Sequence, residues 1–297
     1  MKVLVSDPIS PKGVEILREE GFLVEERGDR DITDLIGDFD GVIVRSATKI
    51  TEEVMAAAGN LKVIGRAGIG LDNIDLEAAK KRGIEVLNTP GATSPSVAEL
   101  AIAMLLAISR NLVKGTMGLK EGKWEKKKLK GRELCGLRLG ILGIGGIGSE
   151  LASKAQALGM DVLGYRRHPT GKESAKVVGL DELLETSDVV SIHLPLTNET
   201  RHMISYKEFD KMKDGAILIN CARGGIVDEK ALYDNLKSGK LYGAGIDVYE
   251  TEPPGNNPLF TLDNVVLTPH IGGQTTEGQD RCGVEIVRSV VEALRGG

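Results

Sequence analysis

Hydrophobic residues along this chain occur in short β-branched runs, and amphipathic segments separate one run from the next. Near the N-terminus the runs expected to be strands are residues 2–6, 41–45, 62–65 and 85–87, and a segment such as 11–20 has its apolar residues at helical spacing. A second series follows at residues 138–142, 161–165, 189–194, 216–220, 242–247 and 264–268. Strands that alternate with helices predict parallel sheets layered by helices, which is the α/β class.

The two series of strands predict two domains, which also suits a length of 297 residues. A turn-rich segment, 88–95, separates the series and introduces a long helix from about residue 96 to residue 110. A second crossing is expected near 271–275, after which the amphipathic segment 279–294 returns to the first domain. The predicted domains are 1–95 with 274–297, and 96–273.

Charge and cysteine content narrow the class of partner. A formal net charge of −5 at pH 7 argues against nucleic acid or an anionic membrane as the main partner and favours a small metabolite. Three cysteines, Cys135, Cys221 and Cys282, show no metal-ligand spacing, so we expect free thiols in a reducing compartment. The first residues lack the apolar core of a signal peptide, and the longest apolar run, 100–108, is too short to span a membrane. We expect a cytoplasmic protein.

A glycine-rich turn carries the most specific local signal in the chain. Gly143, Gly145 and Gly148 stand at G-x-G-x-x-G spacing between the predicted strand 138–142 and a helical segment, 149–158. In such turns the first glycine permits a tight bend and the second lets the backbone approach a pyrophosphate. The third lets the helix pack closely with its N-terminus toward the anion. The strand before and the helix after it predict a dinucleotide site.

Three polar residues follow predicted strands of the second series, where open parallel sheets bind their ligands. His270 is suited to exchanging a proton near neutral pH, as hydride transfer between a nicotinamide and a 2-hydroxy acid requires. Glu252 is suited to hydrogen-bonding that imidazole and favouring its protonated form. Arg223 offers a planar fork for a substrate carboxylate and the adjacent carbonyl. His193, at the end of the run 189–194, is an equally good candidate for a partly buried core histidine or a residue that borders the cofactor.

Several longer motifs resemble those of one known family. They are Val44-Arg-Ser-Ala-Thr48, Gly65-Arg-Ala-Gly-Ile-Gly-Leu-Asp-Asn-Ile-Asp75, Asn88-Thr-Pro-Gly91, Val97-Ala-Glu-Leu100, Gly122-Lys-Trp-Glu125, the glycine fingerprint, Asn220-Cys-Ala-Arg-Gly-Gly-Ile-Val-Asp-Glu229, Glu252-Pro-Pro254 and Pro269-His-Ile-Gly-Gly273. On these motifs the chain resembles the D-2-hydroxyacid dehydrogenases over nearly its whole length. The resemblance implies a Rossmann-type cofactor domain and a discontinuous flavodoxin-like substrate domain.

The resemblance also implies roles for individual residues. Arg223, Glu252 and His270 would be the catalytic residues, and Asp247 would lie near the nicotinamide amide. The residues implied to line the dinucleotide are Ile69, Gly143, Gly145, Gly146, Ile147, Gly148, Leu194, Cys221, Ala222, Asp247, Gly272 and Gly273. Arg45, Ser46 and Gly68 would face the substrate from the first domain. The long helix after Ser96 would help to build a homodimer, and no metal is expected.

Three positions depart from the family pattern. Arg166 and Arg167 stand where an acidic residue normally binds the adenosine ribose, so they predict that NADP is accepted as well as NAD. Gly146 replaces an arginine that many relatives carry beside the pyrophosphate. Lys126 stands where an arginine often reaches the neighbouring subunit's substrate phosphate, and lysine binds phosphate without a bidentate fork.

The activity that the resemblance favours is oxidation of D-3-phosphoglycerate to 3-phosphohydroxypyruvate, the first step of serine biosynthesis. An NADPH-dependent glyoxylate or hydroxypyruvate reductase on the same scaffold is the nearest alternative, and the arginine pair favours it. A dinucleotide-sensing scaffold without catalysis is the alternative from another class, since fold is a poor guide to role. The presence of Arg223, Glu252 and His270 favours an enzyme.

Overall fold

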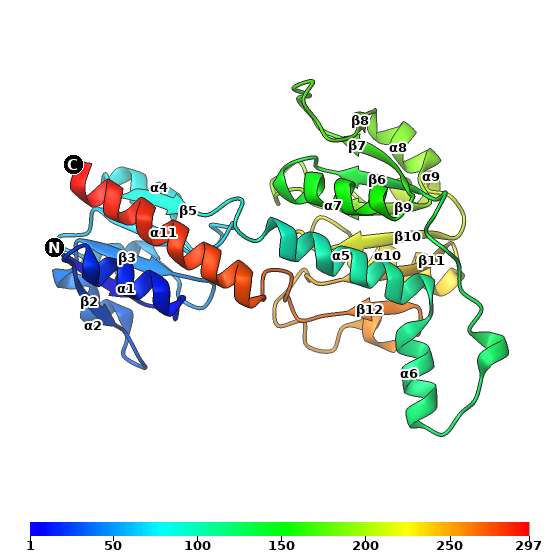
Figure 1. Cartoon of the computed structure of the whole chain (residues 1–297), viewed down its shortest axis with the longest axis horizontal. Coiled ribbons are helices and arrows are strands. Elements are labelled where there is room, and N and C mark those ends of the chain that lie inside the picture. The colour runs from blue at the N-terminus through cyan, green and yellow to red at the C-terminus, as the bar shows by residue number, and fades with distance from the viewer. Residues whose placement is uncertain (297) are drawn as a thin grey trace. The chain divides into compact units, whose positions relative to one another are not determined.

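The computed structural model describes residues 1–296 and contains two compact units, each built on an all-parallel sheet with helices on both faces (Figure 1). The first unit is Met1–Ser94 together with the segment from Gly273 onward, and the second unit is Pro95–Gly272. The first unit is therefore discontinuous in sequence, because its last helix follows the whole of the second unit.

The first unit has a five-stranded sheet in the order β2-β1-β3-β4-β5. Its elements are β1 (Lys2–Val5), α1 (Pro11–Glu19), β2 (Leu23–Glu26), α2 (Ile32–Leu35), η1 (Ile36–Asp38), β3 (Gly41–Val44), α3 (Glu52–Ala57), β4 (Val63–Arg66), α4 (Leu76–Lys81), β5 (Glu85–Asn88) and α11 (Thr276–Gly296). This strand order is that of the flavodoxin-like doubly wound fold.

Alternate residues of the central strands fill two separate cores in this unit. Val3 and Val5 of β1 face α1 and α11, whereas Leu4 faces the helices α2, α3 and α4. Figure 1 shows α11, in red, running beside α1. The helix α11 packs so closely that a Cβ atom built on Gly65 of β4 would lie 2.6 Å from Cγ2 of Val290. Glycine at 65 therefore sets the distance between sheet and helix.

The second unit has a seven-stranded sheet in the order β12-β11-β10-β9-β6-β7-β8. Its elements are α5 (Ser94–Ser109, whose first residue lies at the boundary), α6 (Leu112–Lys120), η2 (Lys126–Lys128), β6 (Arg138–Leu142), α7 (Gly146–Ala157), β7 (Asp161–Tyr165), β8 (Lys176–Val177), α8 (Leu180–Thr186), β9 (Val189–Ile192), α9 (Tyr206–Lys211), β10 (Ala216–Asn220), α10 (Glu229–Ser238), β11 (Leu241–Ile246), η3 (Pro258–Thr261) and β12 (Val265–Leu267).

The second sheet is wound in both directions from β6. The chain moves outward through β7 and β8, then returns to β9 on the other side of β6 and continues to β12. This is the Rossmann order, extended by one strand, and its switch point lies between β6 and β9. One core packs α5 and α7 on the sheet, and the other packs α8, α9 and α10 on the opposite face. The α/β fold class with two doubly wound sheets, expected from the sequence, is confirmed.

Some elements differ from those expected. The strands β2 and β8 were not predicted, because β2 is an edge strand whose four residues end in two glutamates and β8 has two residues. The long helix begins at Ser94 instead of about residue 96. No single helix of residues 1–296 is long and apolar enough to cross a membrane, although α5 and α6, which meet at a bend of 63°, meet the length and composition criteria together.

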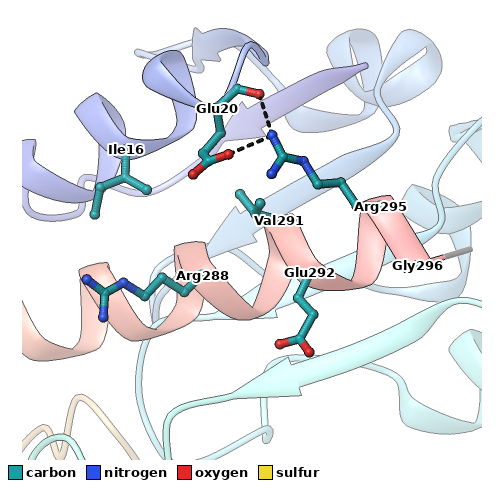
Figure 2. Close-up of a pocket in the computed structure, with 7 residues that line it drawn as sticks. All are labelled: Ile16, Glu20, Arg288, Val291, Glu292, Arg295 and Gly296. Carbon is teal, nitrogen blue, oxygen red and sulfur yellow. Dashed lines mark hydrogen bonds and ion pairs between the residues drawn. The ribbon is translucent and has the colours of Figure 1, made fainter.

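A shallow pocket lies between α1 and α11 of the first unit (Figure 2). It is lined by Ile16, Glu20, Arg288, Val291, Glu292, Arg295 and Gly296. The guanidinium of Arg295 donates to the carbonyl oxygen of Glu20 at 3.0 Å and lies 2.6 Å from its carboxylate. None of the site residues predicted from the sequence lines this pocket. Its contacts tie the end of α11 to the end of α1, which is a structural role.

Candidate active site

The glycine fingerprint forms the turn between β6 and α7. Gly143 has φ +101°, a conformation that side chains rarely adopt, and a Cβ atom there would lie 2.4 Å from the carbonyl oxygen of His193. A Cβ atom on Gly148 would lie 2.2 Å from the carbonyl oxygen of Gly143. These two glycines are therefore required by the protein's own packing, since each lets backbone approach backbone.

Gly145 is different, because a Cβ atom built on it meets no protein atom within 4 Å. It is the N-cap of α7, and no side chain of the described residues caps the helix there. The helix has 12 residues, and its first ones are Gly146, Ile147 and Gly148. An N-terminus without a side-chain cap, beside a glycine that opens on free space, fits the pyrophosphate of a dinucleotide.

His270 and Glu252 form a hydrogen-bonded pair in the second unit. Nδ1 of His270 lies 2.7 Å from Oε2 of Glu252, and both side chains are partly exposed. The other carboxylate oxygen of Glu252 accepts the backbone N–H of Tyr249 at 3.1 Å. The phenol of Tyr249 donates to the carbonyl oxygen of Thr268 at 3.0 Å, and its burial raises the pKa of Tyr249 to about 12. In the described residues the pairing with Glu252 thus uses Nδ1 of His270 and not Nε2.

Asp247 holds the loop that carries the histidine. Its fully buried carboxylate accepts three hydrogen bonds: from the Thr268 hydroxyl at 2.5 Å and from the backbone N–H groups of Ile271 and Gly272, each at 2.8 Å. The backbone N–H of His270 donates to the Asp247 carbonyl at 2.8 Å, and His270 has φ +53°. Such a conformation costs energy in a residue with a side chain and persists where the surroundings impose it. The contact of Asp247 with a nicotinamide amide stays a prediction.

Arg223 lies in the turn after β10. The Asn220 side chain holds this turn, because its amide donates to the Arg223 carbonyl at 3.1 Å and its oxygen accepts the N–H of Ala222 at 3.1 Å. A Cβ atom on Gly224 would lie 1.7 Å from the carbonyl oxygen of Tyr249. The arginine turn therefore packs directly against the segment that leads to Glu252. The three predicted catalytic residues thus stand on neighbouring loops at the carboxyl ends of β10, β11 and β12.

Other predicted cofactor residues lie at the ends of β9 and β10. Leu194 follows β9, and Cys221 and Ala222 follow β10. Burial raises the pKa of the Cys221 thiol, whose Sγ lies 3.7 Å from Sδ of Met104, so Cys221 is a core residue and not a nucleophile. Nε2 of His193 lies 2.8 Å from the Ser191 hydroxyl, and burial lowers the pKa of His193 to about 4. His193 is therefore a neutral residue that packs beside the fingerprint.

The two arginines that follow β7 are both paired with carboxylates. Nη1 of Arg166 lies 3.6 Å from Oε1 of Glu173, a carboxylate whose pKa is lowered to about 2 by hydrogen bonds from Thr170. Arg167 makes two hydrogen bonds to Glu199, and this pairing lowers the pKa of the Glu199 carboxyl. The sequence motif indicates the arginines but neither partner, because Glu173 follows in an irregular loop and Glu199 is 32 residues from Arg167.

The remaining predicted residues belong to other parts of the chain. Arg45, Ser46, Gly68, Ile69 and Gly273 lie in the first unit, on loops that follow its strands or join the units. The Asn88 side chain donates to the Ile69 carbonyl at 2.7 Å and so holds that loop. Lys126 begins η2, a short exposed turn of three lysines in the second unit. No group of three or more His, Cys, Asp or Glu side chains in residues 1–296 is arranged to hold a metal ion.

Arg66 is a residue that the sequence analysis did not single out. It ends β4, and a Cβ atom on Gly68 would lie 1.6 Å from Nη1 of Arg66, so its guanidinium lies directly beneath the Gly68 loop. A signal was present in the sequence, because Arg66 directly follows the predicted strand 62–65 and Arg45 ends the predicted strand 41–45. The motif Gly65-Arg-Ala indicates the family but by itself gives Arg66 no separate role.

A glycine turn that fits a dinucleotide and a histidine–carboxylate pair beside an arginine define a nicotinamide-dependent oxidoreductase. The model of the "D-isomer specific 2-hydroxyacid dehydrogenase, NAD binding domain" family matches residues 102–272. The chain therefore belongs to the D-isomer specific 2-hydroxyacid dehydrogenases, whose members are NAD-dependent oxidoreductases.

Similar proteins agree with this family. A hydroxypyruvate reductase of Thermotoga maritima is 49% identical over 99% of this chain and 98% of its own length. A D-3-phosphoglycerate dehydrogenase of Methanocaldococcus jannaschii is 45% identical, and the alignment covers all of this chain but 58% of the relative. A Thermus thermophilus protein of known crystal structure superimposes with a TM-score of 0.91 at 40% identity, covering 100% of this chain and 97% of that one.

The contrast between two glycines of the fingerprint can be tested. Gly145→Ala should leave the free energy of unfolding within about 0.5 kcal/mol of the wild type, because its Cβ meets no protein atom, yet should raise the Kd for NAD or NADP about tenfold. Gly148→Ala should lower the free energy of unfolding by about 1–3 kcal/mol, because its Cβ would collide with Gly143. Urea denaturation measures the free energy of unfolding, and calorimetric titration measures the Kd. Unchanged dinucleotide affinity in Gly145→Ala would contradict the assignment.

Proposed function

We propose that this enzyme transfers hydride between a nicotinamide dinucleotide and C2 of a three-carbon 2-hydroxy acid, and that it oxidises D-3-phosphoglycerate to 3-phosphohydroxypyruvate. The observation that carries the reaction type is the 2.7 Å hydrogen bond between His270 and Glu252, on loops next to the Arg223 turn. The oxidation needs a base for the hydroxyl proton and a cation for the acid group.

His270 is the acid–base group in this proposal. Glu252 accepts the hydrogen bond from Nδ1–H, which fixes the tautomer and leaves Nε2 to take the proton of the substrate hydroxyl. The positive charge that then forms on the imidazole is stabilised by the carboxylate at 2.7 Å. In the reverse direction the same imidazolium donates its proton to the carbonyl oxygen of a 2-keto acid. The nicotinamide, when bound, supplies or accepts the hydride.

Arg223 binds the acid group of the substrate in this proposal. Its guanidinium donates to the Ala222 carbonyl at 2.7 Å, and the Asn220 side chain holds the backbone of the turn. A planar fork with several donors can bind a carboxylate and polarise the neighbouring carbonyl together, which a lysine cannot do as well. Glu252, His270 and Arg223 thus divide the work between proton transfer and substrate orientation. Their presence also favours an enzyme over a dinucleotide-sensing scaffold.

Two observations support a phosphorylated substrate. The relative from Methanocaldococcus jannaschii, named as a D-3-phosphoglycerate dehydrogenase, is 45% identical over the whole of this chain. The chain also carries cations suited to phosphate, with Arg45 and Arg66 at strand ends of the first unit and three lysines, 126–128, in η2. The chain spans 58% of that relative's length, so the activity is inferred from the shared part.

Reduction of hydroxypyruvate or glyoxylate is the second candidate. The relative from Thermotoga maritima, named as a hydroxypyruvate reductase, is 49% identical and aligned over nearly its full length. The arginine pair after β7 favours NADPH, and that cofactor suits the reductive direction. The two candidates share every catalytic residue and differ in whether a phosphate is bound.

A homodimer is part of the proposal. The segment from α6 to η2 exposes the large apolar side chains of Leu112, Val113, Met117, Leu119 and Trp124, the last with 81% of its surface exposed. Several large exposed apolar side chains on one short segment are typical of an interface between subunits. A second copy of the chain would cover these side chains, and Lys126, which follows them, would then lie near the partner subunit.

Substitution of the proposed acid–base pair should separate catalysis from binding. His270→Gln should lower kcat by about 10²–10⁴-fold while the Kd for the dinucleotide changes less than about threefold, because the imidazole acts on the substrate proton. Glu252→Gln should have a smaller effect, since the amide oxygen can still accept from Nδ1–H. Steady-state kinetics and calorimetry measure these effects. Turnover within twofold of the wild type in His270→Gln would refute the assignment.

A substrate panel should distinguish the two candidates. If a phosphate is bound, kcat/KM for D-3-phosphoglycerate should exceed that for D-glycerate by about 10²-fold, because charge-assisted hydrogen bonds contribute on the order of 1.5–3 kcal/mol each. Lys126→Ala should reduce this ratio, whereas Lys123→Ala, whose lysine is paired with Glu121, should not. Equal efficiencies for the two acids, or for 3-phosphohydroxypyruvate and hydroxypyruvate, would favour the reductase.

Cofactor preference should depend on the pairs after β7. We expect NADPH to be used with a kcat/KM at least comparable to that for NADH, since the 2′-phosphate can replace Glu199 and Glu173 as partner of the two arginines. Arg166→Asp should lower kcat/KM for NADPH on the order of 10²-fold and spare NADH. Glu199→Gln should raise NADPH use severalfold by releasing Arg167. A wild type that uses only NADH would contradict this proposal.

A further inference from the structure

A buried carboxylate in the first unit holds the loop that follows β3. Asp7, which is 3% exposed, accepts the backbone N–H of Arg45 at 2.6 Å and that of Thr48 at 3.1 Å. Its other oxygen accepts the Thr48 hydroxyl at 2.6 Å. Among residues 1–296 no lysine, arginine or histidine lies within ion-pair distance of this carboxylate, so N–H and O–H dipoles compensate its charge.

Asn73 completes the frame from the other side of the loop. Its side-chain amide donates to the carbonyl oxygen of Arg45 at 2.8 Å and to that of Thr48 at 2.5 Å. The first and last residues of the loop thus have both backbone groups bound by side chains: the N–H groups by an acceptor and the carbonyls by a donor. Between them, Ser46 and Ala47 are exposed.

The same set of donors holds the histidine loop of the second unit. Asp247 also accepts two backbone N–H groups and one threonine hydroxyl, and it also follows a buried strand. In that unit the loop so held carries His270. The two aspartates therefore perform the same physical task in two unrelated sheets, which is to fix a loop at the carboxyl end of a strand without using a cation.

The position of the loop in its sheet points to a ligand. Asp7 follows β1 and Arg45 follows β3, and β1 and β3 are the neighbours at which the strand order of the first sheet reverses. Ligands of open parallel sheets bind at such switch points, beyond the carboxyl ends of the strands. Within residues 1–296 the Arg45 guanidinium makes two long hydrogen bonds, at 3.5 Å to the Pro8 carbonyl and at 3.5 Å to Gln274, so it can turn to an anion.

We infer that Asp7 and Asn73 are positioning residues for the substrate: they hold the 45–48 loop so that Arg45 and Ser46 meet an anionic group of the 2-hydroxy acid. The inference rests on the proposed function, since it takes Arg45 and Ser46 to face the 2-hydroxy acid of that proposal. Neither Asp7 nor Asn73 touches the substrate itself. Their effect is exerted through the shape of the loop.

Removal of the Asn73 amide is the direct test. Asn73→Ala should raise KM for the preferred acid about tenfold with kcat within about threefold, because the loop binds its anionic group equally before and during hydride transfer. The Kd of the dinucleotide should not change. Asn73→Asp should raise KM further than Asn73→Ala, since it places a carboxylate against two carbonyl oxygens. Asp7→Asn should be milder than Asp7→Ala, because one amide oxygen can still accept both N–H groups on the Oδ2 side.

A matched control lies two residues away. Asp75 caps α4 by accepting the N–H of Ala78 at 2.9 Å, and its side chain makes no hydrogen bond to residues 45–48 in the described structure. Asp75→Ala should lower stability by about 1 kcal/mol, as the loss of a helix cap does, and leave KM unchanged. An equal rise of KM in Asp75→Ala and Asn73→Ala would overturn the inference, because the rise would then come from a general loss of stability of the first unit and not from the 45–48 loop.

A double-mutant cycle tests whether Asn73 acts through Arg45. Asn73→Ala should add little to the KM of Arg45→Ala, since the loop then has no guanidinium to position. Fully multiplicative effects would overturn the inference. If the wild type turns over none of the tested 2-hydroxy or 2-keto acids, the proposed function fails instead. In that case amide hydrogen exchange of residues 45–50 tests whether Asn73 holds the loop. Exchange should accelerate in Asn73→Ala and not in Asp75→Ala. Unchanged exchange in Asn73→Ala would overturn the inference.

Discussion

The buried carboxylate of Asp247 is the interaction on which the active-site geometry depends. It draws the Thr268 hydroxyl and the N–H groups of Ile271 and Gly272 around one point, while its own carbonyl accepts the N–H of His270. A buried charge is costly unless every lone pair finds a donor, so the loop has little freedom to rearrange. The left-handed conformation of His270 is held by this constraint, and from it Nδ1 meets Glu252 at 2.7 Å.

Much of the fold could be predicted because its causes are local in sequence. Buried parallel strands appear as short runs of β-branched residues, and a glycine spacing marks the turn at the end of β6. The strand β2 escaped prediction because it has only two apolar residues followed by two glutamates and buries none of them fully, and β8 escaped because it has only two residues. Strand order needed the structure, since the sequence alone does not say which strands become neighbours.

The candidate site shows the same division between local and distant causes. Arg223, Glu252 and His270 could be identified because each follows a strand and has the required chemistry, and the resemblance to a family gave their roles. The residues that hold the Arg45 loop and pair with Arg167 could not be identified in the same way. Asp7, Asn73 and Glu199 are separated from the groups they bind by 38, 28 and 32 residues, and only folding brings them together. The reacting groups can therefore be predicted from the sequence more readily than the residues that hold the site loops in place.

The frame around the 45–48 loop has a practical consequence for protein engineering. In the described residues the side chains of Asp7 and Asn73 hold the loop through its backbone atoms and the Thr48 hydroxyl, and they do not use the side chains at 46 and 47. A library restricted to these two exposed positions would vary the chemistry offered to an incoming acid while the scaffold beneath stays constant. Selectivity could then be redesigned in small steps, without repacking a core or retuning the proton-transfer pair.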